Sequence, residues 1–122
     1  MKQQYVTITG FSYYYGTQPF VIGNLIRCCK EPKNLQDAEA IQCRLPCIGT
    51  VGYIANSTHT VAGGTMSAGR IYDLVPDKFF VRVLFTTKTK IICQVESGDP
   101  AQLAKELFSQ MDDDEDRSDN EI

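Results

Sequence analysis

Four tyrosines have the residue type and the spacing to stack against nucleic-acid bases. Tyr13, Tyr14 and Tyr15 are consecutive, Tyr53 lies further along the chain, and both groups stand beside a glycine. Small β-barrels hold single-stranded bases on aromatic side chains of this kind, at about 1–3 kcal/mol per base. The alternative is ordinary packing in a core. Because side chains alternate between the two faces of a strand, at least one of three consecutive tyrosines must point outward.

Other reactive side chains lack the partners that catalysis needs. His59 is the only histidine, and it lies in a polar run where a solvated surface side chain is the simpler interpretation. Asp73 and Asp77 have no evident partner for dividing the roles of acid and base. Arg70 and Ile71 follow two glycines five residues apart, at positions where a phosphate-binding loop needs a lysine and a hydroxyl. We therefore predict that the chain is not an enzyme.

The five cysteines favour neither a disulfide framework nor a metal site. Their number is odd, and no Cys-x-x-Cys pair occurs. We expect free and mostly buried thiols that pack as small hydrophobic side chains, and neither a metal nor another cofactor. The sequence also shows no apolar run typical of a signal peptide or a membrane span. These features predict a cytoplasmic protein with no membrane partner.

Short segments with period-2 alternation predict a small, mainly β domain over residues 1–111. A chain of 122 residues is long enough for one modest core. The glycine-rich residues 60–70 show no clear period, so we predict a loop or one helical turn there. A hairpin turn is expected at residues 87–89. The predicted strands are residues 5–11, 24–30, 38–45, 51–55, 79–86 and 90–96.

One helix and an acidic tail are predicted at the C-terminus. Pro100 suits the first helical position after a possible cap at Asp99, and apolar residues then recur at helical spacing as far as Met111. This stripe must dock on the body or on a partner. Residues 112–121 hold seven acidic side chains and one basic one, so their charge is −6. Because the whole chain has a net charge of −3, residues 1–111 carry +3. We predict that residues 112–122 are disordered.

Four motifs follow one another in an order that is typical of one family. They are residues 8–16 (ITGFSYYYG), 25–29 (LIRCC), 31–41 (EPKNLQDAEAI) and 49–54 (GTVGYI). The family pattern is a strand with glycine and paired aromatics, an apolar strand, an acidic-Pro-x-Asn loop that closes on Asp-x-x-Ala-Ile, and a Val-Gly-(Tyr or His)-(Leu or Ile) strand. Over roughly residues 6–96 the chain resembles the HIRAN domain. The resemblance implies a modified OB-like β-barrel of about six strands.

The resemblance also implies a pocket for the 3′ end of single-stranded DNA. Tyr13 and Tyr14 match the paired aromatics that hold terminal bases, and Asp37 matches the carboxylate that meets the terminal sugar hydroxyl. We expect Tyr53 to join this pocket and nearby basic side chains to steer the DNA backbone. The predicted nucleic-acid-binding set is Tyr13, Tyr14, Asp37, Tyr53, Arg27, Lys30 and Lys33.

Some positions depart from the family pattern. Ser12, Ala55 and Asn56 replace basic residues, and Gln36 replaces an aromatic one. These replacements remove phosphate contacts and one stacking surface. The alternative hypothesis is a protein-interaction or regulatory adaptor, in which residues 100–122 bind a protein partner through the helix and the acidic tail.

Overall fold

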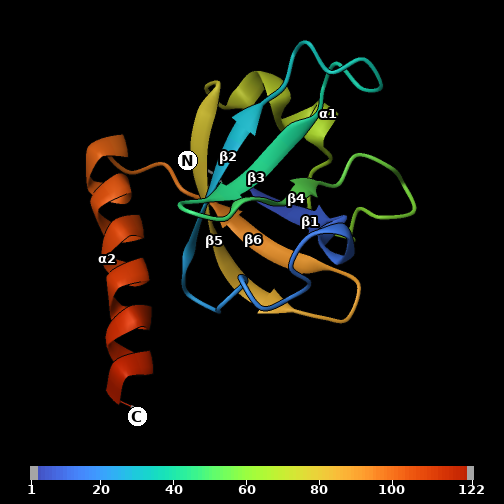
Figure 1. Cartoon of the computed structure of the whole chain (residues 1–122). Coiled ribbons are helices and arrows are strands. Elements are labelled where there is room, and N and C mark those ends of the chain that lie inside the picture. The colour runs from blue at the N-terminus through green and yellow to red at the C-terminus, as the bar shows by residue number, and fades with distance from the viewer. Residues whose placement is uncertain (1–2, 121–122) are drawn as a thin grey trace.

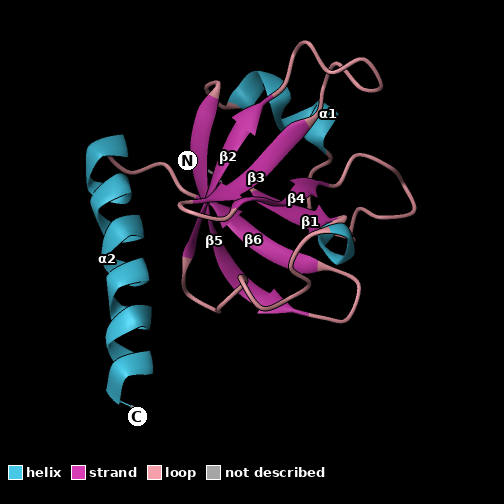
Figure 2. Cartoon of the chain, in the orientation of Figure 1, coloured by secondary structure: helices cyan, strands magenta, loops and turns pink. Residues whose placement is uncertain are grey.

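Six strands pair into a closed antiparallel barrel in the order β1-β4-β3-β2-β5-β6. The structure is a computed structural model that describes residues 3–120, with side chains for residues 3–111. Figures 1 and 2 show the barrel with a long C-terminal helix along one side, which confirms the predicted fold class. The strands are β1 (Tyr5–Thr9), β2 (Leu25–Lys30), β3 (Ile41–Leu45), β4 (Gly49–Ile54), β5 (Lys78–Thr86) and β6 (Ile91–Val95). The helical elements are the 3₁₀ helices η1 (Phe11–Tyr13) and η2 (Tyr72–Leu74) and the α-helices α1 (Ala68–Ile71) and α2 (Pro100–Asn120).

Apolar side chains fill the inside of the barrel, because alternate residues of each strand point inward. Cys28, Cys43 and Cys93 are among them, all buried and free, and the sulfur atoms of Cys28 and Cys43 lie 4.0 Å apart. Burial raises the pKa of the Cys43 and Cys93 thiols, so they stay protonated and behave as hydrophobic side chains. Other members of this core are Val6, Ile8, Ile26, Ile41, Val51, Val81, Val83 and Ile91.

Two strands lose two or more residues at one end relative to the sequence prediction. β1 ends at Thr9 because Gly10 takes a left-handed conformation (φ 74°) and starts the 3₁₀ turn η1, so Phe11 is not part of the strand. β3 begins at Ile41, three residues after the predicted start, because side chains in the preceding loop bind its backbone in place of a neighbouring strand.

Helix α2 docks on the barrel through both apolar and polar contacts. Leu103 and Leu107 are buried. The side-chain amide of Gln110 accepts a hydrogen bond from the Leu25 N–H (2.7 Å) and donates one to the Leu25 carbonyl (2.9 Å), so it satisfies the end of β2 as a neighbouring strand would. Arg82 on β5 also binds the carboxylate of Glu106. The predicted apolar stripe therefore packs on the body of this chain through Leu103 and Leu107, whereas Phe108 stays exposed.

The backbone of α2 continues to Asn120, nine residues past the predicted end at Met111. No glycine or proline follows Pro100, so nothing in the sequence stops the helix at the first aspartates. The helix boundary at Met111 is thus corrected, while disorder of residues 112–122 stays a prediction, and residues 121–122 lie outside the described part of the chain. None of the helices within residues 3–120 is long and apolar enough to cross a membrane.

Candidate nucleic-acid interface

A hollow of about 480 Å³ opens where three separate segments of the chain meet. We call it the tyrosine hollow. Figure 1 shows its segments, namely the turn at η1 and the loops that precede β3 and follow β4, on the side of the barrel away from α2. It is lined by Tyr14, Asn34, Gln36, Asp37, Ala40, Tyr53, Ile54, Asn56, Ser57 and Thr60. The structure therefore brings together Tyr14, Asp37 and Tyr53 of the predicted set.

The turn after β1 holds Tyr14 at the rim of the tyrosine hollow. Phe11 is buried and packs edge to face on Phe20, with 5.9 Å between ring centroids. The N–H of Tyr14 donates to the Phe11 carbonyl (3.0 Å), which fixes Tyr14 just above this anchor. Tyr14 is 43% exposed and lines the hollow, whereas Tyr13 is 87% exposed and does not. Of the paired tyrosines, only Tyr14 forms part of the wall.

Glu31 fixes the position of Tyr53, the second aromatic side chain that lines the tyrosine hollow. The hydroxyl of Tyr53 donates to Glu31 Oε2 (3.2 Å), and the side-chain amide of Asn34 donates to Glu31 Oε1 (3.1 Å). Burial is the largest cause that raises the pKa of Tyr53; the Gln42 side chain lowers this pKa, and the Glu31 carboxylate raises it. Tyr53 is therefore a neutral phenol whose hydroxyl is already bonded, so its ring is the part that can contact a ligand.

Hydrogen bonds hold the Asp37 carboxylate from two sides. One oxygen accepts from the Glu39 N–H (2.9 Å), and the other accepts from the side-chain amide of Asn56 (3.3 Å). The amide oxygen of Asn56 in turn accepts from the Gly69 N–H at the start of α1 (2.8 Å). Two carboxylate oxygens offer about four acceptor positions, so Asp37 can still accept a hydrogen bond from a ligand hydroxyl.

A second hollow of about 470 Å³ adjoins the first. We call it the lysine hollow, and it is lined by Glu31, Pro32, Lys33, Asn34 and Tyr53. Asn34 and Tyr53 line both hollows, so the two form one continuous depression. No lysine or arginine is among the lining residues of the tyrosine hollow, whereas Lys33 contributes its exposed side chain to the lysine hollow.

Two predicted basic residues lie away from both hollows. Lys30 is held on the barrel by a hydrogen bond from its ammonium to the Val75 carbonyl (2.8 Å) and lies 4.4 Å from the centre of the Tyr72 ring. Its side chain is only 11% exposed. The guanidinium of Arg27 lies 5.5 Å from the centre of the Phe80 ring, on the face that leads to α2. Neither side chain lines the tyrosine hollow or the lysine hollow.

The residues that position the site are not among those predicted from the sequence. Asn34 could have been found, because an asparagine that precedes an aspartate by three residues is typical of a self-bonded turn, and its side chain accepts from the N–H groups of Gln36 and Asp37 (2.9 and 3.1 Å). In the sequence, Asn56 stands out only as the replacement of a basic residue. Its bond to Asp37 spans 19 positions, and no local signal predicts such a contact.

Comparison with known proteins agrees with this architecture. The sequence-family model of the HIRAN domain matches residues 1–73. The crystal structure of the HIRAN domain of human HLTF is similar to this chain, with a TM-score of 0.54 and 16% sequence identity over 76% of this chain and 72% of that one. This likeness supports the fold. A separate comparison with curated proteins found no match to the sequence. The family model covers more than half of the chain, and the protein is therefore a member of the HIRAN domain family.

Proposed function

We propose that the chain is a binding module for single-stranded DNA, without catalytic activity, that takes a free 3′ end in the tyrosine hollow. Membership of the HIRAN domain family supports a nucleic-acid-binding module in general terms. The observation that carries the finer proposal is the convergence of Tyr14, Asp37 and Tyr53 on one hollow from three distant segments. Two aromatic rings beside a carboxylate suit a terminal nucleoside, which offers a flat base and a free hydroxyl.

The charge of the tyrosine hollow favours a hydroxyl end over a phosphorylated end. Asp37 can accept a hydrogen bond from a 3′ hydroxyl, but it repels a 3′ phosphate. No basic side chain lines this hollow to offset that repulsion. Lys33 lines the adjoining lysine hollow, and we propose that it meets the phosphate that precedes the terminal nucleoside. The proposal therefore predicts discrimination between chemically different ends of one sequence.

The test is a comparison of two short oligonucleotides that differ only in a 3′ hydroxyl or a 3′ phosphate, measured by fluorescence anisotropy at low salt. We expect tighter binding of the hydroxyl form. Asp37→Asn should remove most of this preference while keeping the loop, because asparagine can still accept from the Glu39 N–H. Asp73→Asn, an exposed change outside the hollow, is the matched control. Equal binding of both ends by the wild-type protein would refute end recognition.

A protein-interaction adaptor is the weaker proposal. Leu103 and Leu107 of the apolar stripe are already buried against the barrel, so a partner could use only the exposed face of the helix, including Phe108, and the acidic residues 112–122. Pull-down with the full chain and with a chain lacking residues 112–122 separates the two proposals. Loss of every partner on truncation supports the adaptor, whereas nucleic-acid recovery that does not depend on these residues supports the DNA-binding module.

A further inference from the structure

A third hollow, distinct from the candidate interface, lies between the barrel and α2. Its volume is about 430 Å³, and its wall includes Arg27 on β2, Arg44 on β3 and Phe108 on α2. Leu45, Pro46 and Ile48 supply an apolar floor from β3 and the turn that follows it. Phe108 is 55% exposed, so an aromatic ring faces solvent beside two guanidinium groups. We call this the arginine hollow.

The two arginines are directly opposite each other in the β2–β3 ladder. Like charges at paired positions of antiparallel strands destabilise the sheet. Among residues 3–111, the ion pairs are formed by Lys30 and Arg82, and none involves Arg27 or Arg44. The side-chain contacts of the two arginines are with neutral groups: Arg27 lies over the Phe80 ring, and Arg44 donates to the side-chain oxygen of Gln42 (2.9 Å). Because no carboxylate of residues 3–111 pairs with either arginine, an anion that is not part of these residues would best offset their mutual repulsion.

The outer face of β3 connects the arginine hollow with the tyrosine hollow. Gln42 is the ladder partner of Tyr53, and Arg44 stands two residues further along the same face. A strand rises about 3.3 Å per residue, so the step from Gln42 to Arg44 is about 7 Å. Figure 1 shows β3 crossing the front of the barrel from the loop that carries Asp37 toward α2. A polar path therefore runs from Tyr53 through Gln42 to the two arginines.

We infer that a single DNA strand whose 3′ end lies in the tyrosine hollow continues over β3, with Arg44 and Arg27 binding its upstream phosphates and Phe108 offering a stacking surface. This inference rests on the proposed function. It also explains how a pocket without basic lining residues can hold a polyanion, because the positive charge lies further along the strand. Sites of about 4 to 16 nucleotides are usual for barrels of this type.

The test compares a thymidine dinucleotide with an octanucleotide, both with a free 3′ hydroxyl, by fluorescence anisotropy across a salt series. The octanucleotide should bind the wild-type protein more tightly than the dinucleotide. The double variant Arg27→Gln/Arg44→Gln should lose up to about 30-fold in octanucleotide affinity at low salt, at up to about 1 kcal/mol for each of the two exposed contacts. For the double variant, the slope of log K (the association constant) against log salt concentration should become shallower by about 1.4, because each phosphate contact on a single strand contributes about 0.7. Dinucleotide affinity should stay unchanged.

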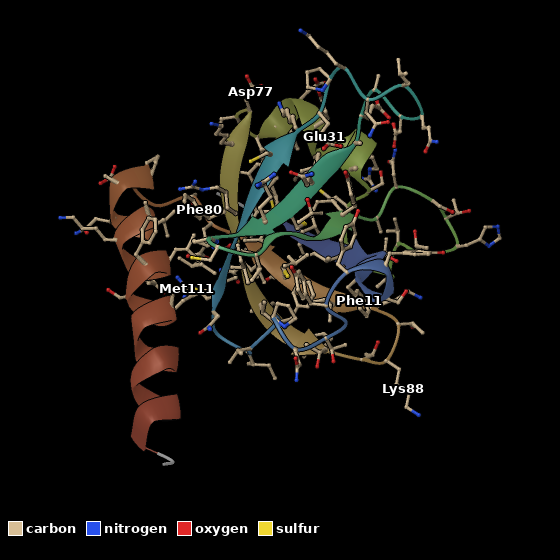
Figure 3. The ribbon with its side chains drawn as sticks, in the orientation of Figure 1. Phe11, Glu31, Asp77, Phe80, Lys88 and Met111 are labelled. Atoms are coloured by element: carbon tan, nitrogen blue, oxygen red, sulfur yellow. The ribbon has the colours of Figure 1, made fainter. Side chains whose placement is uncertain are left out.

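Lys88→Gln/Lys90→Gln removes two charges from the hairpin between β5 and β6 and serves as the matched control. Figure 3 shows Lys88 far from α2, whereas Phe80, the neighbour of Arg27, lies on the side that faces α2. The arginine variant should also unfold at an equal or higher temperature, because a like-charge pair is removed, so any loss of binding is not a loss of folding.

Three outcomes would overturn the inference: equal affinity for both oligonucleotides, a loss in the arginine variant no larger than in the lysine control, or an octaglutamate peptide that binds the arginines more tightly than the octanucleotide does. The last result would assign the arginine hollow to an acidic protein segment. Failure of the wild-type protein to bind the dinucleotide would instead refute the proposed function. The inference would fall with it, because it needs a 3′ end in the tyrosine hollow, whereas loss of the arginine effect alone would overturn the inference and leave the proposed function standing.

Discussion

At the scale of single residues, the two tyrosines of the family motif have different environments. Tyr14 lines the tyrosine hollow, and Tyr13 is almost fully exposed beside it. Tyr53 completes the aromatic wall, with its hydroxyl bonded to Glu31. The sequence indicated which aromatic residues matter, but the turn after Gly10 determines which of them faces the pocket. Tyr14 should therefore contribute more to the free energy of DNA binding than Tyr13 does.

The first prediction concerns this difference. Tyr14→Ala should weaken binding of a 3′-hydroxyl oligonucleotide by about 5- to 150-fold, which corresponds to the loss of one stacked base at about 1–3 kcal/mol. Tyr13→Ala is the paired variant and should weaken binding less, because its side chain is not part of the wall. Isothermal titration calorimetry on both variants checks this. An equal or larger loss in Tyr13→Ala would mean that the exposed tyrosine carries the contact.

The second prediction concerns the buried thiols. Burial raises the pKa of Cys93, and that of Cys43, above the ordinary value of 9.0. A group with a raised pKa in the folded state contributes stability below its unfolded pKa, and that stability is lost as the pH rises above it. The free energy of unfolding should therefore fall above about pH 9, by up to about 1.4 kcal/mol per pH unit for each thiol. Urea unfolding of the wild-type protein and of Cys93→Val, under reducing conditions, should show a shallower fall in the variant.

At the scale of elements, the barrel strands follow their sequence pattern except where backbone geometry intervenes. Alternation in β5 predicts Phe79, Val81, Val83 and Phe85 on one face, and the first three are buried. Phe85 is 52% exposed, because the β5–β6 register shifts between Val83 and Phe85 and one extra residue reverses the face. Periodicity therefore predicts a strand well, but it gives no sign of a bulge.

The third prediction concerns helix α2 as part of the folded body. Leu107→Ala should lower the free energy of unfolding by about 2–5 kcal/mol, because it leaves a cavity under a helix that packs on β2. Lys105→Ala, an exposed change two residues away, is the control and should alter stability by at most about 0.5 kcal/mol. Urea denaturation measures both. A negligible effect of Leu107→Ala would show that α2 is detached from the barrel in solution.

At the scale of the whole molecule, the charge is divided between two parts of the chain. Residues 1–111 carry +3, and residues 112–121 carry −6. The acidic run begins four residues after Phe108, which lines the arginine hollow. We therefore expect these residues to compete with a polyanion for the basic surface of the body, an effect that salt should screen. This division is visible in the sequence, but the position of Phe108 beside Arg27 and Arg44 is not.

The fourth prediction follows from this charge division. Deleting residues 112–122 should strengthen octanucleotide binding at low salt and should have little effect near 1 M salt, where the Debye length falls to about 3 Å. The deletion keeps Leu103, Leu107 and Gln110, so the melting temperature should hardly change. Replacing the seven acidic residues with their amides, at full length, is the control for charge alone. If binding is unchanged at every salt concentration, these residues play no part in access to the site.

The sequence by itself determined the mainly β class, most of the strands, the C-terminal helix and the family motifs, because these depend on local alternation, helical spacing and turn residues. Only the tertiary structure placed Tyr14, Asp37 and Tyr53 around one hollow, moved Lys30 and Arg27 away from it, and paired Arg27 with Arg44. These outcomes depend on ladder register and on contacts between distant segments, such as Asn56 with Asp37. Closure of the barrel fixes such contacts, and no local pattern in the sequence encodes them.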